Sequence, residues 1–409
     1  MDNSIFFLPK LLLSDRAKRL ILALISLLTL ILSACYREKG EIKVEIDEPA
    51  PVVDFNRLRA MEIASSLDDR CLVSQLFISG IEGNGSLSEK MNDLLKNIPA
   101  GGIMLFGYNL KSDSETVRSY MTDIITLIVD ESGIPPFIST DHEGGRVNRF
   151  INGIGEMPWA SSYIETALKE GSKPVLQKIQ EDSKKAGMEI YSLGINMNLA
   201  PIAEYLIPEN IDFLRRRSYG SDPVFTAQAS VAFIKGMKEA GIICVVKHFP
   251  GTAGNDPHYS ASVLNMDKNH LNLLIAPFVA AINNGARAIM ASHTVVPAID
   301  SKVASLSSVV MRDWLRKEIG FEGLIISDDF TMAAAGDLKP EESSVLSIAA
   351  GSDMVLVWPM YLKKTYDAFI AALEDGTLTR ERLIDSVQRV IYEKLLLGLP
   401  MNWDTETAD

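Results

Sequence analysis

Several residue types are scarce in this 409-residue chain, and each scarcity excludes a class of protein. Three cysteines are too few for a disulfide framework. The five histidines include no His-X-His pair, and the chain has no HExxH or CxxC motif, so we expect no catalytic metal and no cofactor. Lys and Arg number 40 against 53 Asp and Glu, and the resulting net charge of −13 argues against a nucleic-acid partner. The remaining composition, 47% hydrophobic and 23% charged, is that of a globular protein.

The first 34 residues have the three parts of an export signal. Four basic residues lie between positions 10 and 19, an uncharged apolar run covers 20–34, and small residues precede Cys35. The run is shorter than the roughly 20 residues of a typical membrane-spanning helix. Leu32-Ser33-Ala34-Cys35 resembles the bacterial lipobox, which implies cleavage before Cys35 and lipidation of Cys35.

We therefore expect a signal peptide at 1–34, a flexible tether at 35–54 and a catalytic domain at 55–409. An uncleaved N-terminal anchor is the alternative to a lipoprotein signal. Either arrangement predicts a protein of the bacterial cell envelope, held at a membrane outside the cytoplasm.

From about residue 55, short apolar runs alternate with longer amphipathic stretches. Apolar strands separated by helices indicate a parallel sheet covered on both faces. Eight such repeats fit a single (β/α)8 barrel better than the alternative, a doubly wound open sheet. The predicted strands are 74–78, 102–106, 137–140, 195–199, 242–247, 286–291, 323–327 and 354–358, and the predicted helices include 114–130, 175–193, 223–240, 269–284 and 308–319.

Polar residues come after the apolar residues of four predicted strands. Asp141 follows 137–140, Lys247 and His248 follow the apolar residues 242–246, His293 comes after 286–291, and Asp328 follows 323–327. The carboxyl ends of barrel strands meet at one mouth, where barrel enzymes place their catalytic groups. A single Asp at a strand end more often caps the next helix. Four coincident positions instead predict a functional site.

Six segments in a fixed order resemble glycoside hydrolase family 3, in its single-barrel β-N-acetylhexosaminidase branch. They span nearly the whole chain after the export signal. The segments are Gly101-Gly102-Ile103-Met104-Leu105-Phe106, Thr140 to Phe150 (TDHEGGRVNRF), Asn198-Leu199-Ala200-Pro201, Arg217 to Pro223 (RSYGSDP), Lys247-His248-Phe249-Pro250-Gly251, and Gly320 to Phe330 (GFEGLIISDDF).

The resemblance implies a role for each matching position. Asp328 matches the family nucleophile, a carboxylate able to attack the anomeric carbon. Asp329 stands one residue too late for that role, and we expect its side chain to support the loop or cap the next helix.

The acid/base in this branch resembles an Asp-X-His pair, which here is Asp256-Pro257-His258. An imidazole titrates near pH ~6.5, so it can donate and later accept a proton. This chain departs from the family, which usually reads Lys-His-Phe-Pro-Gly-His-Gly; here Thr252-Ala253 ends that motif and the segment before Asp256 is shorter. The alternative is an incidental turn at residues 256–258.

Five further positions match the sugar-binding residues of the family. Carboxylates accept hydrogen bonds from hydroxyl groups, and Lys and Arg donate to hydroxyl oxygens. His293 is expected to line the pocket or to be structural, Glu204 stands where the family often has Asp and has no assigned role, and Cys71 and Cys244 are expected to pack in the core. The five sugar-binding positions are Asp141, Arg149, Arg217, Lys247 and His248.

The resemblance thus predicts a monomeric, retaining exo-β-N-acetylglucosaminidase that acts on peptidoglycan fragments or related β-linked oligosaccharides through a covalent intermediate on Asp328. Two alternatives remain open at this point. A β-glucosidase of the same superfamily typically takes its acid from an added domain, for which this chain has no room. A lipid-anchored, catalytically inactive sugar-binding barrel is favoured only by the altered loop.

Overall fold

The computed structural model describes residues 54–402, apart from 151–152, 255, 257–258 and 333–334. Eight parallel strands form one sheet, in the order β10-β7-β5-β4-β3-β2-β1-β11. An additional bridge between Ile326 and Met354 links the two outer strands, so the sheet nearly closes on itself. The strands are β1 (Phe77–Gly80), β2 (Gly102–Leu105), β3 (Phe137–Thr140), β4 (Met197–Asn198), β5 (Ile243–Phe249), β7 (Ala288–Ala291), β10 (Leu324–Ser327) and β11 (Val355–Val357).

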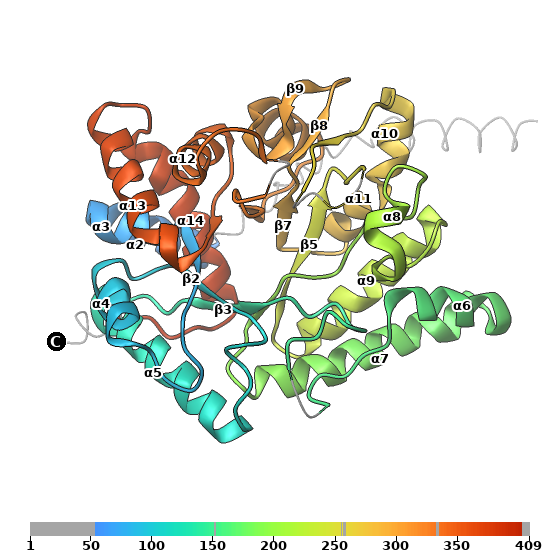
Figure 1. The fold of residues 1–409 in the computed structure, drawn as a ribbon, viewed down its shortest axis with the longest axis horizontal. Helices are drawn as coiled ribbons and strands as arrows, with labels where there is room; N and C mark the ends of the chain where they lie inside the picture. Colours follow the sequence, from blue (N-terminus) through green and yellow to red (C-terminus); the bar gives the residue numbers. More distant parts are fainter. Residues whose placement is uncertain (1–53, 151–152, 255, 257–258, 333–334, 403–409) are drawn as a thin grey trace, which may run out of the picture. The chain divides into compact units, whose positions relative to one another are not determined.

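Helices surround these strands, as Figure 1 shows, and the predicted (β/α)8 barrel is confirmed. The longer helices are α2 (Phe55–Ser66), α4 (Glu89–Asn97), α5 (Ser114–Ser132), α6 (Ala160–Glu170), α7 (Ser172–Tyr191), α9 (Pro223–Glu239), α12 (Pro340–Ala350), α13 (Pro359–Glu374) and α14 (Arg380–Leu396). The shorter ones are α3 (Asp69–Ser74), α8 (Ile211–Leu214), η1 (Arg215–Arg217), α10 (Lys268–Leu274), α11 (Ala276–Asn283) and η2 (Ala304–Leu306). A ten-residue π-helix, η3 (Val309–Glu318), precedes β10.

Local sequence explains where several helices begin. Asp113 caps α5 by accepting hydrogen bonds from the backbone amides of Glu115 and Thr116. Asp222 caps α9 in the same way, with Pro223 in the first turn, where its missing N–H costs no hydrogen bond. The Asp-Pro pair therefore fixes the start of α9 as the sequence predicts.

Two expectations from the sequence differ from the structure, and one sheet was not expected. The predicted strand 74–78 begins too early, because residues 69–74 form α3. The predicted helix 269–284 is two helices, with Pro277 in the first turn of α11. A second, three-stranded sheet of β6 (Ser262–Val263), β8 (Thr294–Val296) and β9 (Asp300–Val303) follows the order β6-β8-β9 and has no counterpart in the prediction.

The barrel interior is a packed apolar core rather than a channel. Alternate residues of the eight strands point inward and form one buried cluster. Val390 of α14 belongs to the same cluster, so α14 packs against the barrel core. The inward-facing residues include Ile78, Met104, Phe137, Leu199, Val245, Met290, Ile326 and Leu356.

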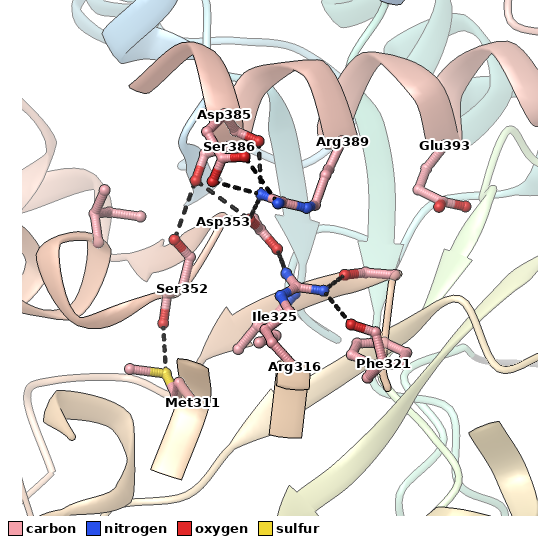
Figure 2. Close-up of polar contacts among 12 residues, drawn as sticks. Met311, Arg316, Phe321, Ile325, Ser352, Asp353, Asp385, Ser386, Arg389 and Glu393 are labelled. Atoms are coloured by element: carbon pink, nitrogen blue, oxygen red, sulfur yellow. Dashed lines mark hydrogen bonds and ion pairs between the residues drawn. The ribbon is translucent and has the colours of Figure 1, made fainter. Parts of the chain in front are cut away.

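A buried ion network joins α14 to the barrel at the start of β11 (Figure 2). Asp353 is fully buried, and its carboxylate pairs with Arg316 and, at 3.2 Å, with Arg389 of α14. The same carboxylate accepts a hydrogen bond from the backbone amide of Ile325 in β10, at 2.8 Å. The network therefore ties η3, α14 and two neighbouring strands together away from the strand ends that carry the polar motif residues.

Asp353→Asn should destabilise the fold by about 3 to 5 kcal/mol, because it leaves the largely buried guanidinium group of Arg316 without its anion. Equilibrium urea denaturation measures this loss. The matched control is Asp313→Asn, which breaks the exposed pair between Asp313 and Lys317 on η3 and should change stability by less than about 0.5 kcal/mol. Equal effects of the two variants would contradict the role assigned to Asp353.

Candidate active site

A pocket of about 340 Å³ lies at the carboxyl ends of the barrel strands. Its wall divides into a polar half, supplied by residues after β3 and β10, near the end of β5 and in η1, and an apolar half, supplied mainly by β1, β2 and β11. The polar lining residues are Asp141, Glu143, Arg149, Arg217, Lys247, His248, Asp328 and Asp329, and the apolar ones include Ile78, Met104, Phe106, Leu199, Phe213, Met290, Leu356 and Trp358.

Lys247 is the centre of the polar half. It is 3% exposed, and its Nζ lies 2.8 Å from both Asp141 Oδ1 and Glu143 Oε1. Arg149 Nη2 pairs with the other oxygen of Asp141 at 2.9 Å. Arg217 donates from Nε and Nη2 to the two oxygens of Glu143, both at 2.9 Å. Two carboxylates and three cations thus form one connected cluster.

The cluster fixes the charge of each member. Burial alone would raise the pKa of Asp141, but Lys247 and Arg149 outweigh burial and hold that pKa below its ordinary value. Burial would likewise raise the pKa of Glu143, but Lys247 and Arg217 lower it far more strongly. Burial would lower the pKa of Lys247, yet the two carboxylates raise it. At neutral pH all three groups are therefore ionised.

This charge state limits what Glu143 can do. A general acid must carry a proton near the working pH. Glu143 is held as a carboxylate by two cations, so it is unsuited to protonate a leaving group. It serves instead to orient Arg217 and Lys247 in the pocket wall.

Asp328 stands at the end of β10, half-buried in the pocket lining. Its backbone amide donates to Ala291 O at 3.2 Å, which ties it to β7. Its carboxylate Oδ1 accepts a hydrogen bond from the amide of Asp329 at 2.8 Å. These contacts hold a carboxylate at the mouth, beside the cluster centred on Lys247.

Asp329 has a different role, as the sequence predicts. Its Oδ1 accepts from the backbone amide of Thr331 at 2.8 Å, and its Oδ2 accepts from the Thr331 hydroxyl and the Trp358 indole N–H. The carbonyl oxygen of Asp329 lies 3.0 Å from His293 Nε2. Asp329 therefore supports the loop that presents Asp328.

Two histidines near the site are structural. His293 is buried, its Nδ1 lies 2.7 Å from the Ser305 hydroxyl, and it does not line the pocket. His142 contacts Gly155 O through Nε2 at 2.6 Å, and burial lowers its pKa to about 4. Both rings are neutral at pH 7 and hold the loops that carry Asp141 and Asp328.

The structure brings six of the predicted site residues together around one pocket: Asp141, Arg149, Arg217, Lys247, His248 and Asp328. Asp256 is described and does not line this pocket, and His258 lies outside the described residues. The acid/base pair therefore stays a prediction from the sequence. Residues 1–53 are also outside the described part, and with them the signal, Cys35 and most of the tether.

Two kinds of pocket residue were missed at the sequence level. Glu143 lies two residues after Asp141 on the same strand-end segment, and this spacing is the signal that could have identified it as a second pocket carboxylate. Phe106 and Trp358 form a stacked pair with ring centroids 4.8 Å apart. Both are the last residues of predicted apolar strands, where an aromatic residue is hard to distinguish from core. Cys71 and Cys244 are buried, unpaired thiols, as expected.

The described residues contain neither a metal-binding group nor a membrane-spanning helix. Within residues 54–402, less the gaps given above, no three His, Cys, Asp or Glu side chains are grouped so as to hold a metal ion. In the same part of the chain, no helix is both long enough and apolar enough to cross a membrane.

Comparison with known proteins identifies the family. The glycosyl hydrolase family 3 N-terminal domain matches residues 51–392. The chain belongs to glycosyl hydrolase family 3. The predicted glycoside hydrolase is thus confirmed at the level of the family.

Relatives in this family carry consistent names. A protein named beta-hexosaminidase from Neisseria meningitidis serogroup C is 33% identical over 280 residues, which cover 66% of this chain and 74% of the relative. A protein of the same name from Hydrogenovibrio crunogenus is 30% identical over 287 residues, covering 69% and 78%.

Solved family 3 structures share the fold. A β-N-acetylglucosaminidase from Paenibacillus sp. FPU-7 superposes with a TM-score of 0.74 at 30% identity, over 81% of this chain and 63% of that chain. This chain therefore spans less than two thirds of the Paenibacillus protein. Neisseria gonorrhoeae NagZ, solved with N-trifluoroacetyl-D-glucosamine, gives a TM-score of 0.65 at 27% identity, over 76% and 89%.

Proposed function

We propose that this protein is a retaining exo-β-N-acetylglucosaminidase that removes terminal N-acetylglucosamine from β-linked oligosaccharides. The observation that carries the proposal is the placement of Asp328 in one pocket with Asp141, Arg149, Arg217, Lys247 and His248. The relatives named beta-hexosaminidase and the sugar-bound N. gonorrhoeae structure support the choice of sugar.

The two halves of the pocket fit the two kinds of surface on a pyranose. Hydroxyl groups around the ring can donate to Asp141 and accept from the cations beside it. The C–H faces of the ring suit apolar and aromatic walls such as Phe106 and Trp358. A sugar held by both halves is oriented before the reaction begins.

In the proposed reaction, an oxygen of the Asp328 carboxylate bonds to the anomeric carbon while the bond to the leaving oxygen breaks. The leaving oxygen takes a proton from the acid, assigned from the sequence to His258 with Asp256 as its partner. Water then attacks the anomeric carbon and gives one proton to His258, which now acts as the base, and Asp328 is released as a carboxylate. Two displacements at one carbon retain the β configuration.

The natural substrate is proposed to be a peptidoglycan fragment. Its support is the export signal predicted at residues 1–34, because an enzyme anchored by lipid at the bacterial envelope would lie close to peptidoglycan. Chitin-derived oligosaccharides are the alternative, which product analysis with purified muropeptides and N,N′-diacetylchitobiose separates.

The nucleophile assignment predicts that Asp328→Asn lowers kcat on 4-nitrophenyl N-acetyl-β-D-glucosaminide by roughly 10³-fold or more, because the amide cannot form the glycosyl ester. Asp329→Asn is the matched control in the adjacent position. It should lose less activity, since it weakens the loop contacts to Thr331 and Trp358 without removing the attacking group. Full activity of Asp328→Asn would overturn the assignment.

We further propose that Cys35 carries the lipid that anchors the protein to a membrane of the cell envelope. The wild type should incorporate radiolabelled palmitate and Cys35→Ser should not, because the thiol that carries the lipid is lost. Autoradiography of the immunoprecipitated protein measures the label, with Cys71→Ser as the control. A membrane-bound wild type that carries no label would favour an uncleaved apolar anchor.

A further inference from the structure

Glu204 has no role in the reaction described above, yet its surroundings are specific. The residue follows β4, and its side chain is fully buried. Oε1 accepts from the backbone amide of His248 at 3.1 Å and lies 2.8 Å from His248 Nδ1. Oε2 accepts from the backbone amide and the hydroxyl of Thr252, at 2.6 and 2.7 Å.

These four contacts satisfy the carboxylate. An ionised carboxylate offers about four acceptor sites, and here each oxygen meets one backbone N–H and one side-chain donor. Burial of a carboxylate is costly unless such donors replace water. Among the described contacts, all four donors come from two residues, His248 and Thr252, which flank the turn at 249–251.

The contact with Glu204 determines which ring nitrogen of His248 carries hydrogen. Nδ1 faces a carboxylate, so Nδ1 is the donor, and in the neutral ring Nε2 is left as an acceptor. His248 lines the pocket beside Lys247 and Asp328. In this neutral form, the ring offers the pocket an acceptor for a hydroxyl group, next to cations that act only as donors.

Thr252 is the position at which this chain departs from the family motif. Its hydroxyl contacts Glu204, and the side chain is buried. The next residue is fixed as well, because the Ala253 amide donates to Ser262 Oγ at 2.9 Å. Glu204 and Thr252, which the sequence marks as two separate departures, are thus in direct contact.

We propose that Glu204 is a positioning residue, which holds His248 with hydrogen on Nδ1 so that Nε2 accepts a hydrogen bond from a sugar hydroxyl, and that Thr252 orients the Glu204 carboxylate for this task. The inference rests on the proposed glycosidase function. It adds a specific acceptor to the pocket wall and assigns Glu204 and Thr252 to that acceptor.

The test compares Glu204→Gln, Thr252→Val and Thr252→Ser with the wild type on two substrates. N,N′-diacetylchitobiose has a poor leaving group and depends on proton donation, whereas 4-nitrophenyl N-acetyl-β-D-glucosaminide has a good one. Glu204→Gln should lower kcat/KM by about tenfold or more, and by the same factor on both substrates. The reason is that the lost contact is to the N-acetylglucosamine ring, which the two substrates share, and not to the leaving group. Inhibition by free N-acetylglucosamine should weaken by a similar factor.

The two threonine variants form a matched pair. Thr252→Ser keeps the hydroxyl and should stay within about twofold of the wild type, whereas Thr252→Val keeps the shape, loses the hydrogen bond and should lose several-fold in kcat/KM. Thermal unfolding of each variant reports whether the protein is folded. If Glu204→Gln does not fold, this pair decides the question.

Three results would overturn the inference: wild-type kinetics in Glu204→Gln, a loss confined to diacetylchitobiose, or equal activity of Thr252→Val and Thr252→Ser. A loss confined to diacetylchitobiose would mean that Glu204 acts on proton delivery rather than on sugar binding. A wild-type protein that hydrolyses neither substrate would instead overturn the proposed function. An active wild type with an equally active Glu204→Gln variant would overturn only the role assigned to Glu204.

Discussion

The site depends on one buried ammonium group. Lys247 lies between Asp141 and Glu143, with its Nζ 2.8 Å from an oxygen of each. Without this cation, the two largely buried carboxylates would repel one another. Its position near the end of β5 is set by the barrel, and Asp141 and Glu143 come from the segment after β3. Lys247 thus links two strand ends, and the neighbouring guanidinium groups of Arg149 and Arg217 complete the charge balance.

This arrangement separates the duties of the pocket carboxylates by environment. Asp141 and Glu143 are paired with cations and remain ionised, so they bind and orient. Asp329 is engaged by Thr331 and Trp358 and supports its loop. Asp328 lines the same cavity with one hydrogen bond from its neighbour's amide, which leaves it as the carboxylate that we propose attacks the sugar. In the proposed reaction the acid/base comes from outside this set, as the Asp256–His258 assignment made from the sequence has it.

The sequence predicts the features that local patterns encode. Eight continuous apolar runs locate the eight barrel strands, and the polar residues that end them locate the pocket. What the sequence leaves open depends on distant contacts. Glu204 and its donors are 44 and 48 residues apart in the chain, and they meet because β4 and β5 are neighbours in the sheet. β6 has two residues, which is too short for a periodic pattern.

The central claim is that Asp328 forms a covalent bond to the sugar that the Lys247 cluster holds. The most direct test is incubation with 5-fluoro-N-acetyl-β-D-glucosaminyl fluoride, followed by peptide mass spectrometry. The fluorine on the ring slows both displacements, and the good fluoride leaving group keeps the first one fast enough for the covalent intermediate to accumulate. The account predicts one fluorosugar per chain, attached to the peptide that contains Asp328. Attachment to Asp329 or Glu143, or turnover of the reagent with no attached sugar, would contradict it.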